Sequence, residues 1–156
     1  MSALENLYKE IILDHYRSPR NRGELDPPAH KVEGFNPLCG DEIVLYVDID
    51  SEGVVADLKI GGQGCSISQS SASMMSEIIK GKTLQEAQEI IGAFKEMMTI
   101  YENKLVGEEG SGSRSSQVDL GDLEALQGVV KFPVRIKCAT LAWNTLTQSF
   151  AEINEN

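Results

Sequence analysis

The segment EIVLYVDIDSEGVVADLKI, residues 42–60, carries apolar side chains at every second position on both sides of a short polar turn. These positions are Ile43, Leu45, Val47 and Ile49 before the turn and Val54, Ala56, Leu58 and Ile60 after it. A period of two places such side chains on one face of a strand, and the Ser-Glu-Gly turn at residues 51–53 suits a reversal of the chain. The segment therefore predicts an antiparallel hairpin with one buried face.

Helical patterns lie on both sides of this hairpin. Capping-box sequences at residues 2–5 and 83–86 each begin a predicted helix, the first ending near Pro19 and the second running through Met98. Apolar residues at helical spacing predict another helix over residues 67–79, closed by a glycine at position 81. A short helix is expected at 122–127, and Pro133 is expected to begin a long helix reaching Phe150.

The remaining segments have the composition of loops. Residues 17–38 contain four prolines and predict an irregular loop, and residues 101–121 contain the sequence GSGS, which predicts a flexible insertion. We see no internal repeat and no domain linker, so residues 1–156 are interpreted as a single domain. The predicted fold class is α+β, an antiparallel meander sheet with helices packed on one face.

The charge of the chain excludes several function classes. A net charge of -10 repels phosphate backbones and anionic lipids, so we expect no nucleic acid and no membrane partner. No apolar run approaches the roughly 18 residues that span a bilayer, and no signal-peptide pattern is visible. The expected location is cytoplasmic. In that reducing compartment an odd number of cysteines, here three, favours metal ligands or redox groups over structural disulfides.

The three cysteines indicate the chemistry. Cys39 precedes the hairpin with Asp41 two residues later, Cys65 follows a glycine-rich turn at its end, and Cys138 lies near the start of the last helix. Because a hairpin returns the chain to its starting edge, Cys39 and Cys65 are expected to be neighbours. Three thiolates and a carboxylate suit a tetrahedral zinc ion, and thiolates also hold iron–sulfur clusters.

Each of these assignments has a structural alternative. A single cysteine is usually a small buried hydrophobic residue, and Asp41 could instead accept hydrogen bonds from nearby backbone at the start of a strand. The two histidines are interpreted as packed or solvated residues, because His15 lies on an apolar helix face and His30 in the proline-rich segment. The glycines at 61–64 lack the rest of a phosphate-binding loop, so nucleotide binding is not expected.

Several motifs together resemble one known family. These motifs are NPLCGD at residues 36–41, GC at 64–65 with the helix that follows, and RIKC at 135–138 leading to LAW at 141–143. They resemble the IscU/NifU-N/SufU family of iron–sulfur cluster assembly proteins over nearly the whole chain. The scaffold branch of that family has a histidine directly before the third cysteine, whereas this chain has Lys137. That difference and the 101–121 insertion favour the SufU branch, and the implied fold is SufE/NifU-like.

The resemblance implies a role in sulfur transfer. It implies that Cys39, Asp41, Cys65 and Cys138 bind zinc, and that Cys39 leaves the metal to accept persulfide sulfur. The implied partner is a SufS-like cysteine desulfurase that uses pyridoxal phosphate, with downstream Suf-type assembly proteins as recipients. Arg135 and Lys137, beside Cys138, are candidate docking residues for that desulfurase. The chain would be a sulfurtransferase-type acceptor and desulfurase activator rather than a stand-alone enzyme.

Three function classes follow from these observations. The favoured class is a zinc-dependent sulfur acceptor. The second is a scaffold on which a [2Fe–2S] cluster is assembled and transferred, for which Asp41 would have to be the fourth ligand. The third is a thiol hydrolase, which requires a histidine held beside Cys39 or Cys65.

Overall fold

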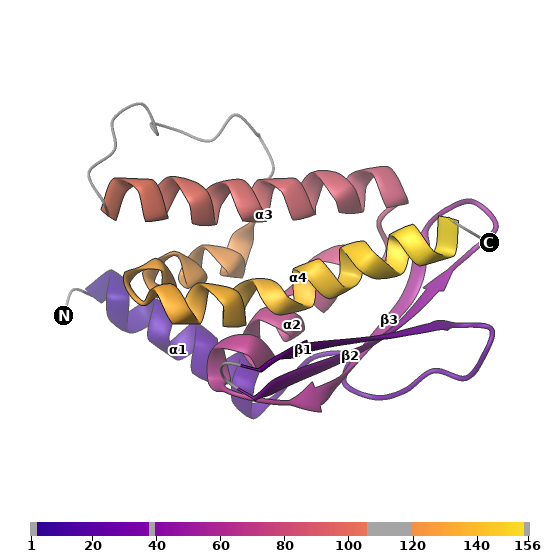
Figure 1. The fold of residues 1–156 in the computed structure, drawn as a ribbon, viewed down its shortest axis with the longest axis horizontal. Helices are drawn as coiled ribbons and strands as arrows, with labels where there is room; N and C mark the ends of the chain where they lie inside the picture. Colours follow the sequence, from indigo (N-terminus) through magenta and orange to yellow (C-terminus); the bar gives the residue numbers. More distant parts are fainter. Residues whose placement is uncertain (1–2, 38–39, 106–119, 155–156) are drawn as a thin grey trace.

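The computed structural model describes residues 3–37, 40–105 and 120–154, and in them a three-stranded sheet carries helices on one face (Figure 1). Strand β2 (Asp41–Ile49) lies in the centre, between β1 (His30–Asn36) and β3 (Val55–Gln63), and both pairings are antiparallel. The predicted hairpin is β2 and β3, with Leu45 opposite Ile60 and Val47 opposite Leu58. The predicted α+β meander is therefore confirmed.

Strand β1 corrects the prediction that residues 17–38 form an irregular loop. Its inward positions hold Val32, Gly34 and Asn36, of which only the first is a large apolar residue, so no apolar alternation marks it in the sequence. The glycine is required by close packing, because a Cβ atom there would overlap the hydroxyl of Thr145. Because two of the three inward positions hold a glycine and an asparagine, a prediction from apolar alternation misses this strand.

The helices follow the predictions with differences at their ends. Helix α1 spans Ala3–Arg17, α2 Ser66–Ile79, α3 Leu84–Leu105 and α4 Pro133–Asn154. Residues 101–105 therefore belong to α3 and not to the insertion, since no glycine or proline interrupts residues 99–105. Of the rest of the predicted insertion, residues 106–119 lie outside the described residues, whereas Leu120 is buried and Gly121 begins the next helix, so these two do not belong to a flexible insertion. The short helix expected at 122–127 is a longer 3₁₀ helix, η1 (Gly121–Lys131).

One of the two capping boxes is visible in the described residues. The backbone N–H of Glu86 donates to the Thr83 hydroxyl, and the Thr83 N–H donates to the Glu86 carboxylate, both at 3.1 Å. The bond from the Thr83 backbone N–H, followed by the Thr83 hydroxyl, holds the pKa of the Glu86 carboxylate below its usual value. The predicted start of α3 is confirmed. The other box includes residue 2, which lies outside the described residues.

The sheet is covered by α2 and α4, and α3 lies on the far side of α4 (Figure 1). The ring of Phe94 in α3 stacks on Trp143 in α4, with ring centroids 4.4 Å apart. The Trp143 indole N–H donates to the Ser71 hydroxyl of α2, which donates to the carbonyl of Ala139 at 2.6 Å. Because Ala139 follows Cys138, this chain of contacts fixes the third cysteine relative to α2.

Gly34 gives a direct test of how β1 packs on α4. We expect Gly34→Ala to lower the free energy of unfolding by about 1–3 kcal/mol, because the new methyl group meets the Thr145 side chain. The matched control is Gly92→Ala in α3, where no atom lies within 4 Å of the added Cβ, and a gain of about 0.5–1 kcal/mol is expected. Urea denaturation would measure both, and equal effects of the two substitutions would contradict the packing described.

Candidate metal centre

Three predicted site residues meet at one end of the sheet. Asp41 is the first residue of β2, Cys65 directly precedes α2, and Cys138 lies in the second turn of α4. One ligand atom from each, a carboxylate oxygen or a sulfur, lies within 4.8 Å of the others. The carboxylate and Cys138 are fully buried, whereas Cys65 is partly exposed. Hairpin geometry predicted that Cys39 and Cys65 would be neighbours. In the described residues it is Asp41, two residues after Cys39, that lies beside Cys65, and Cys138 joins them.

Asp41 makes two different contacts with its two carboxylate oxygens. Oδ1 accepts the backbone N–H of Cys65 at 2.9 Å, and Oδ2 lies 3.9 Å from the sulfur of Cys65. Gly64 allows this approach, because a Cβ atom at that position would overlap Asp41 Oδ1. The structural alternative for Asp41, a carboxylate bonded to backbone, is therefore present, and Oδ2 still faces the thiols. The two roles do not compete for the same oxygen.

The two described thiols have different polar neighbours. The side-chain amide of Asn36, at the end of β1, lies 3.9 Å from the sulfur of Cys138. The hydroxyl of Ser68, one turn into α2, lies 3.9 Å from the sulfur of Cys65 and donates to the Cys65 carbonyl at 3.1 Å. Neither Asn36 nor Ser68 was predicted from the sequence as a site residue. Asn36 could have been found from its place in the NPLCGD motif, because it pairs with Asp41 in the β1–β2 register.

Cys39, the remaining predicted site residue, lies outside the described residues. Described residues near it are held in place, since the Gly40 N–H donates to the Asn36 carbonyl at 2.9 Å and Asp41 begins β2. Its participation in the site stays a prediction.

The two histidines of the chain lie away from the group formed by Asp41, Cys65 and Cys138. His15 is buried, with Nδ1 2.8 Å from the Ser73 hydroxyl and Nε2 3.4 Å from Asp122, and His30 pairs with Glu152 at 2.8 Å. Neither ring belongs to the group that the thiols form, so the histidine–cysteine pair of a hydrolase is not found among the residues described.

Both docking candidates, Arg135 and Lys137, have exposed side chains on the first two turns of α4.

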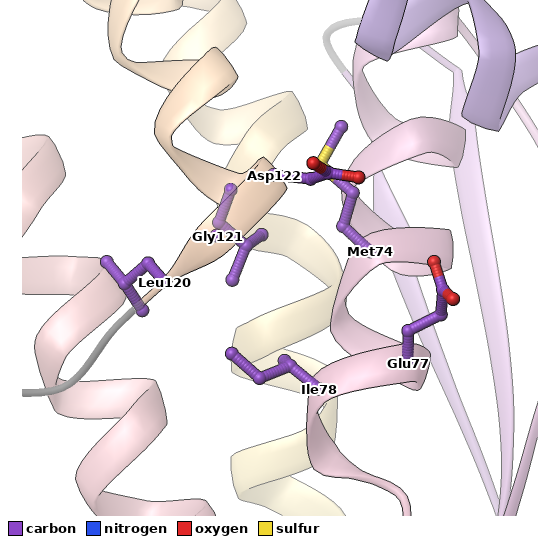
Figure 2. Close-up of a pocket in the computed structure, with 7 residues that line it drawn as sticks. Met74, Glu77, Ile78, Leu120, Gly121 and Asp122 are labelled. Atoms are coloured by element: carbon purple, nitrogen blue, oxygen red, sulfur yellow. The ribbon is translucent and has the colours of Figure 1, made fainter.

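Two pockets border α2, and only one of them is near the thiols. A pocket of about 500 Å³ lies between α1, α2 and η1 and is lined by Ser66 and Ile67, next to Cys65, and by Phe132 and Arg135. A pocket of about 250 Å³ lies between the C-terminal half of α2 and the start of η1, where Met74 and Glu77 face Asp122 (Figure 2). Met74 is nine residues beyond Cys65, roughly 14 Å along the helix, so this second pocket is remote from the sulfur site.

Sequence comparison places the chain in a family. The model of the NifU-like N-terminal domain matches residues 7–139. This chain belongs to that family. The resemblance to IscU, NifU-N and SufU proteins that the motifs indicated is thereby confirmed.

Two relatives of this NifU-like domain are named as a sulfurtransferase and as an iron–sulfur cluster assembly protein. It is 46% identical over 149 residues to the zinc-dependent sulfurtransferase SufU of Bacillus subtilis, covering 96% of this chain and 92% of the relative. It is 40% identical to the iron–sulfur cluster assembly scaffold protein IscU of Streptococcus pyogenes, covering 96% and 86% of the two chains.

A solved structure supports the same placement. The SufU protein of Fervidobacterium islandicum, described as an iron–sulfur cluster assembly scaffold of the SUF system, aligns with a TM-score of 0.68 and 38% identity. The alignment covers 93% of this chain and 97% of that one. In the described part of the NifU-like domain, no helix is long and apolar enough to cross a membrane.

Proposed function

We propose that this chain is a zinc-dependent sulfur acceptor, which takes persulfide sulfur from a cysteine desulfurase and relays it to iron–sulfur cluster assembly. The observation that carries the proposal is that ligand atoms of Asp41, Cys65 and Cys138 lie within 4.8 Å of one another. A third cysteine, Cys39, stands two residues before Asp41 in the sequence. The Bacillus relative, at 46% identity, is named a zinc-dependent sulfurtransferase. The setting we infer is cytoplasmic, where thiols remain reduced.

The donor set fits zinc in kind and in spacing. Zinc prefers four ligands drawn from thiolate, imidazole and carboxylate, and two sulfurs about 2.3 Å from a tetrahedral ion lie about 3.8 Å apart. Ligand atoms already within 4.8 Å of one another need only a small closing movement to reach that spacing. Asp41 Oδ2, Cys65 Sγ and Cys138 Sγ would hold the ion together with the Cys39 thiolate. The bound ion would keep these thiols deprotonated and protected from oxidation.

The sulfur-transfer step is a thiol–persulfide exchange at Cys39. Its thiolate attacks the outer sulfur of the desulfurase persulfide, the S–S bond of that persulfide breaks, and the desulfurase cysteine leaves as a thiolate. The outer sulfur ends on Cys39 with no net oxidation or reduction. The described thiols suit this step less well, because Cys138 is fully buried and the backbone of Cys65 is tied to Asp41.

The face beside Cys65 is suited to the desulfurase. Phe132 and Val134 are large apolar side chains that are more than half exposed, and Phe132 lines the 500 Å³ pocket together with Arg135. Exposed apolar residues around a groove mark interaction sites, and an arginine can pair there with a carboxylate of the partner. We place Arg135 and Lys137 on this docking face, with a SufS-like desulfurase that uses pyridoxal phosphate as partner and Suf-type proteins downstream.

A second candidate function is a scaffold for a [2Fe–2S] cluster. The observation in its favour is that the Streptococcus and Fervidobacterium relatives are described as scaffolds. The same three thiolates would bind the irons, with Asp41 as the fourth ligand. Lys137 stands where the scaffold branch has a histidine ligand, and a protonated lysine cannot coordinate, so the acceptor is favoured.

Elemental analysis of the chain purified without added metal or chelator separates the two functions. A zinc acceptor is expected to carry about one zinc per chain and no acid-labile sulfide. Iron with a matching amount of sulfide would establish the scaffold instead. A metal-free chain with all three thiols reactive toward an alkylating reagent would overturn both proposals.

A further inference from the structure

Asn36 is a polar side chain buried beside a thiol of the proposed zinc site. It is the last residue of β1, only 6% exposed, and pairs with Asp41 across the β1–β2 ladder. Its Nδ2 atom lies 3.9 Å from the sulfur of Cys138. Its backbone carbonyl accepts the Gly40 N–H at 2.9 Å, so the strand end that carries this amide is itself held in place. The carboxamide is therefore fixed toward the thiol from the sheet side.

The amide is a donor that a thiolate can use. A thiolate only accepts hydrogen bonds, whereas the NH₂ group of a carboxamide carries two N–H donors. The Asn36 amide therefore suits a deprotonated Cys138 when its nitrogen, and not its oxygen, faces the sulfur. Another neighbour of this sulfur, the Val134 carbonyl at 3.9 Å, is an acceptor and can serve only a protonated thiol. The contact that suits a metal-bound thiolate is therefore the one that reaches across to β1.

Cys65 has no equivalent donor in Ser68. The Ser68 hydroxyl donates its single proton to the Cys65 carbonyl at 3.1 Å and accepts from the Gln69 side-chain amide at 3.4 Å. Of the side-chain contacts given above for these two sulfurs, the Asn36 amide on Cys138 is the one in which an N–H donor faces the sulfur. The two thiols of the centre are therefore supported unequally.

We propose that Asn36 is a positioning residue that donates an N–H···S hydrogen bond to the Cys138 thiolate and so anchors this cysteine at the metal. The inference rests on the proposed metal centre. A hydrogen bond to a coordinated sulfur draws electron density from it and fixes its direction, and partners of this kind affect metal affinity about 10–100-fold. Cys138 would be the fixed ligand of the centre, while the chain's other thiols remain available for exchange.

Cobalt(II) substitution tests the hydrogen bond, because thiolate-to-cobalt charge-transfer bands report the electron density on sulfur. We expect Asn36→Leu, which keeps the size and removes the donor, to shift these bands to lower energy and to raise the cobalt dissociation constant about tenfold. The matched control is Asn144→Leu, the same substitution at an exposed position of α4, which should leave both quantities unchanged. A variant with wild-type bands and affinity would overturn the inference.

A second measurement needs no variant and so does not depend on whether Asn36→Leu folds. In the ¹¹³Cd-substituted wild-type chain, an N–H···S bond transmits scalar coupling from the metal to the donor proton. We expect a cadmium coupling on a side-chain amide proton of Asn36. Couplings to cysteine Hβ protons without one to this amide would overturn the inference, although the metal centre would stand. If wild-type protein binds neither cobalt nor cadmium, the proposed centre fails, and the inference fails with it.

Discussion

Cys138→Ser is expected to reduce the zinc content from about one ion per chain to near zero. The sulfur of Cys138 is fully buried and lies within 4.8 Å of the ligand atoms of Asp41 and Cys65, so no solvent-facing group can readily replace it. A serine hydroxyl stays protonated near neutral pH and is a poor zinc ligand, whereas a thiolate is a strong one. The remaining donors would form an incomplete site with a much weaker hold on the metal.

Metal analysis after dialysis against a mild chelator would measure this loss, with thermal unfolding recorded on the same samples. The control is Ala142→Ser, which buries a hydroxyl one turn further along α4, away from the ligand atoms. The control is expected to lose stability and to keep its zinc. Full zinc occupancy in Cys138→Ser, or equal losses in both variants, would show that Cys138 is not a ligand.

The part of the centre that the sequence predicts is the part built on the hairpin. Asp41 and Cys65 lie at the open end of β2–β3, and the alternation of Ile43, Leu45 and Val47 against Leu58 and Ile60 matches that pairing. Near the turn the alternation is wrong, because a bulge at Asp48–Ile49 makes Val55 the buried position while Ala56 is exposed. Strand register is a local property, encoded in a period of two and a short turn, so it can be read from one sequence. The closeness of the two hairpin ends, predicted for Cys39 and Cys65 and observed for Asp41 and Cys65, needs no other element.

The position of Cys138 depends on packing that no periodic pattern reports. Helix α4 is set against α2 by Ser71, which bonds both the Ala139 carbonyl and the Trp143 indole, and against β1 by the close contact of Gly34 with Thr145. A serine in a helix and a glycine in a proline-rich segment are ordinary residues when met in sequence. Only in three dimensions do they become the contacts that bring the third cysteine to the site.

Asn36 was missed for the same physical reason as the strand that holds it. Its inward neighbours on β1 are Gly34 and Val32, a set with too little apolar character to predict a buried face. When strand β1 is not predicted, an asparagine directly before Pro37 is interpreted as a turn residue. With it, the same residue becomes a buried amide directed at a thiol.

Cys39→Ser is expected to abolish sulfur acceptance while most of the protein stays folded. A serine hydroxyl is not ionised near neutral pH and cannot attack the outer sulfur of a persulfide, which requires a thiolate. Of the other two thiols, Cys138 is buried, and Cys65 directly precedes a helix and is held through its backbone by Asp41. Neither is expected to replace Cys39 as acceptor.

The measurement is incubation of the chain with a cysteine desulfurase and free cysteine, followed by alkylation and peptide mass mapping of each thiol. Persulfide is expected on Cys39 in the wild-type chain and on no thiol in Cys39→Ser. Persistent labelling of Cys65 or Cys138 alone would contradict the assignment. The control adds an exposed thiol remote from the site by placing Ser51→Cys, in the β2–β3 turn, on the Cys39→Ser background. Labelling there would mean that the desulfurase gives sulfur to any accessible thiol, and the specificity attributed to Cys39 would then come from exposure alone.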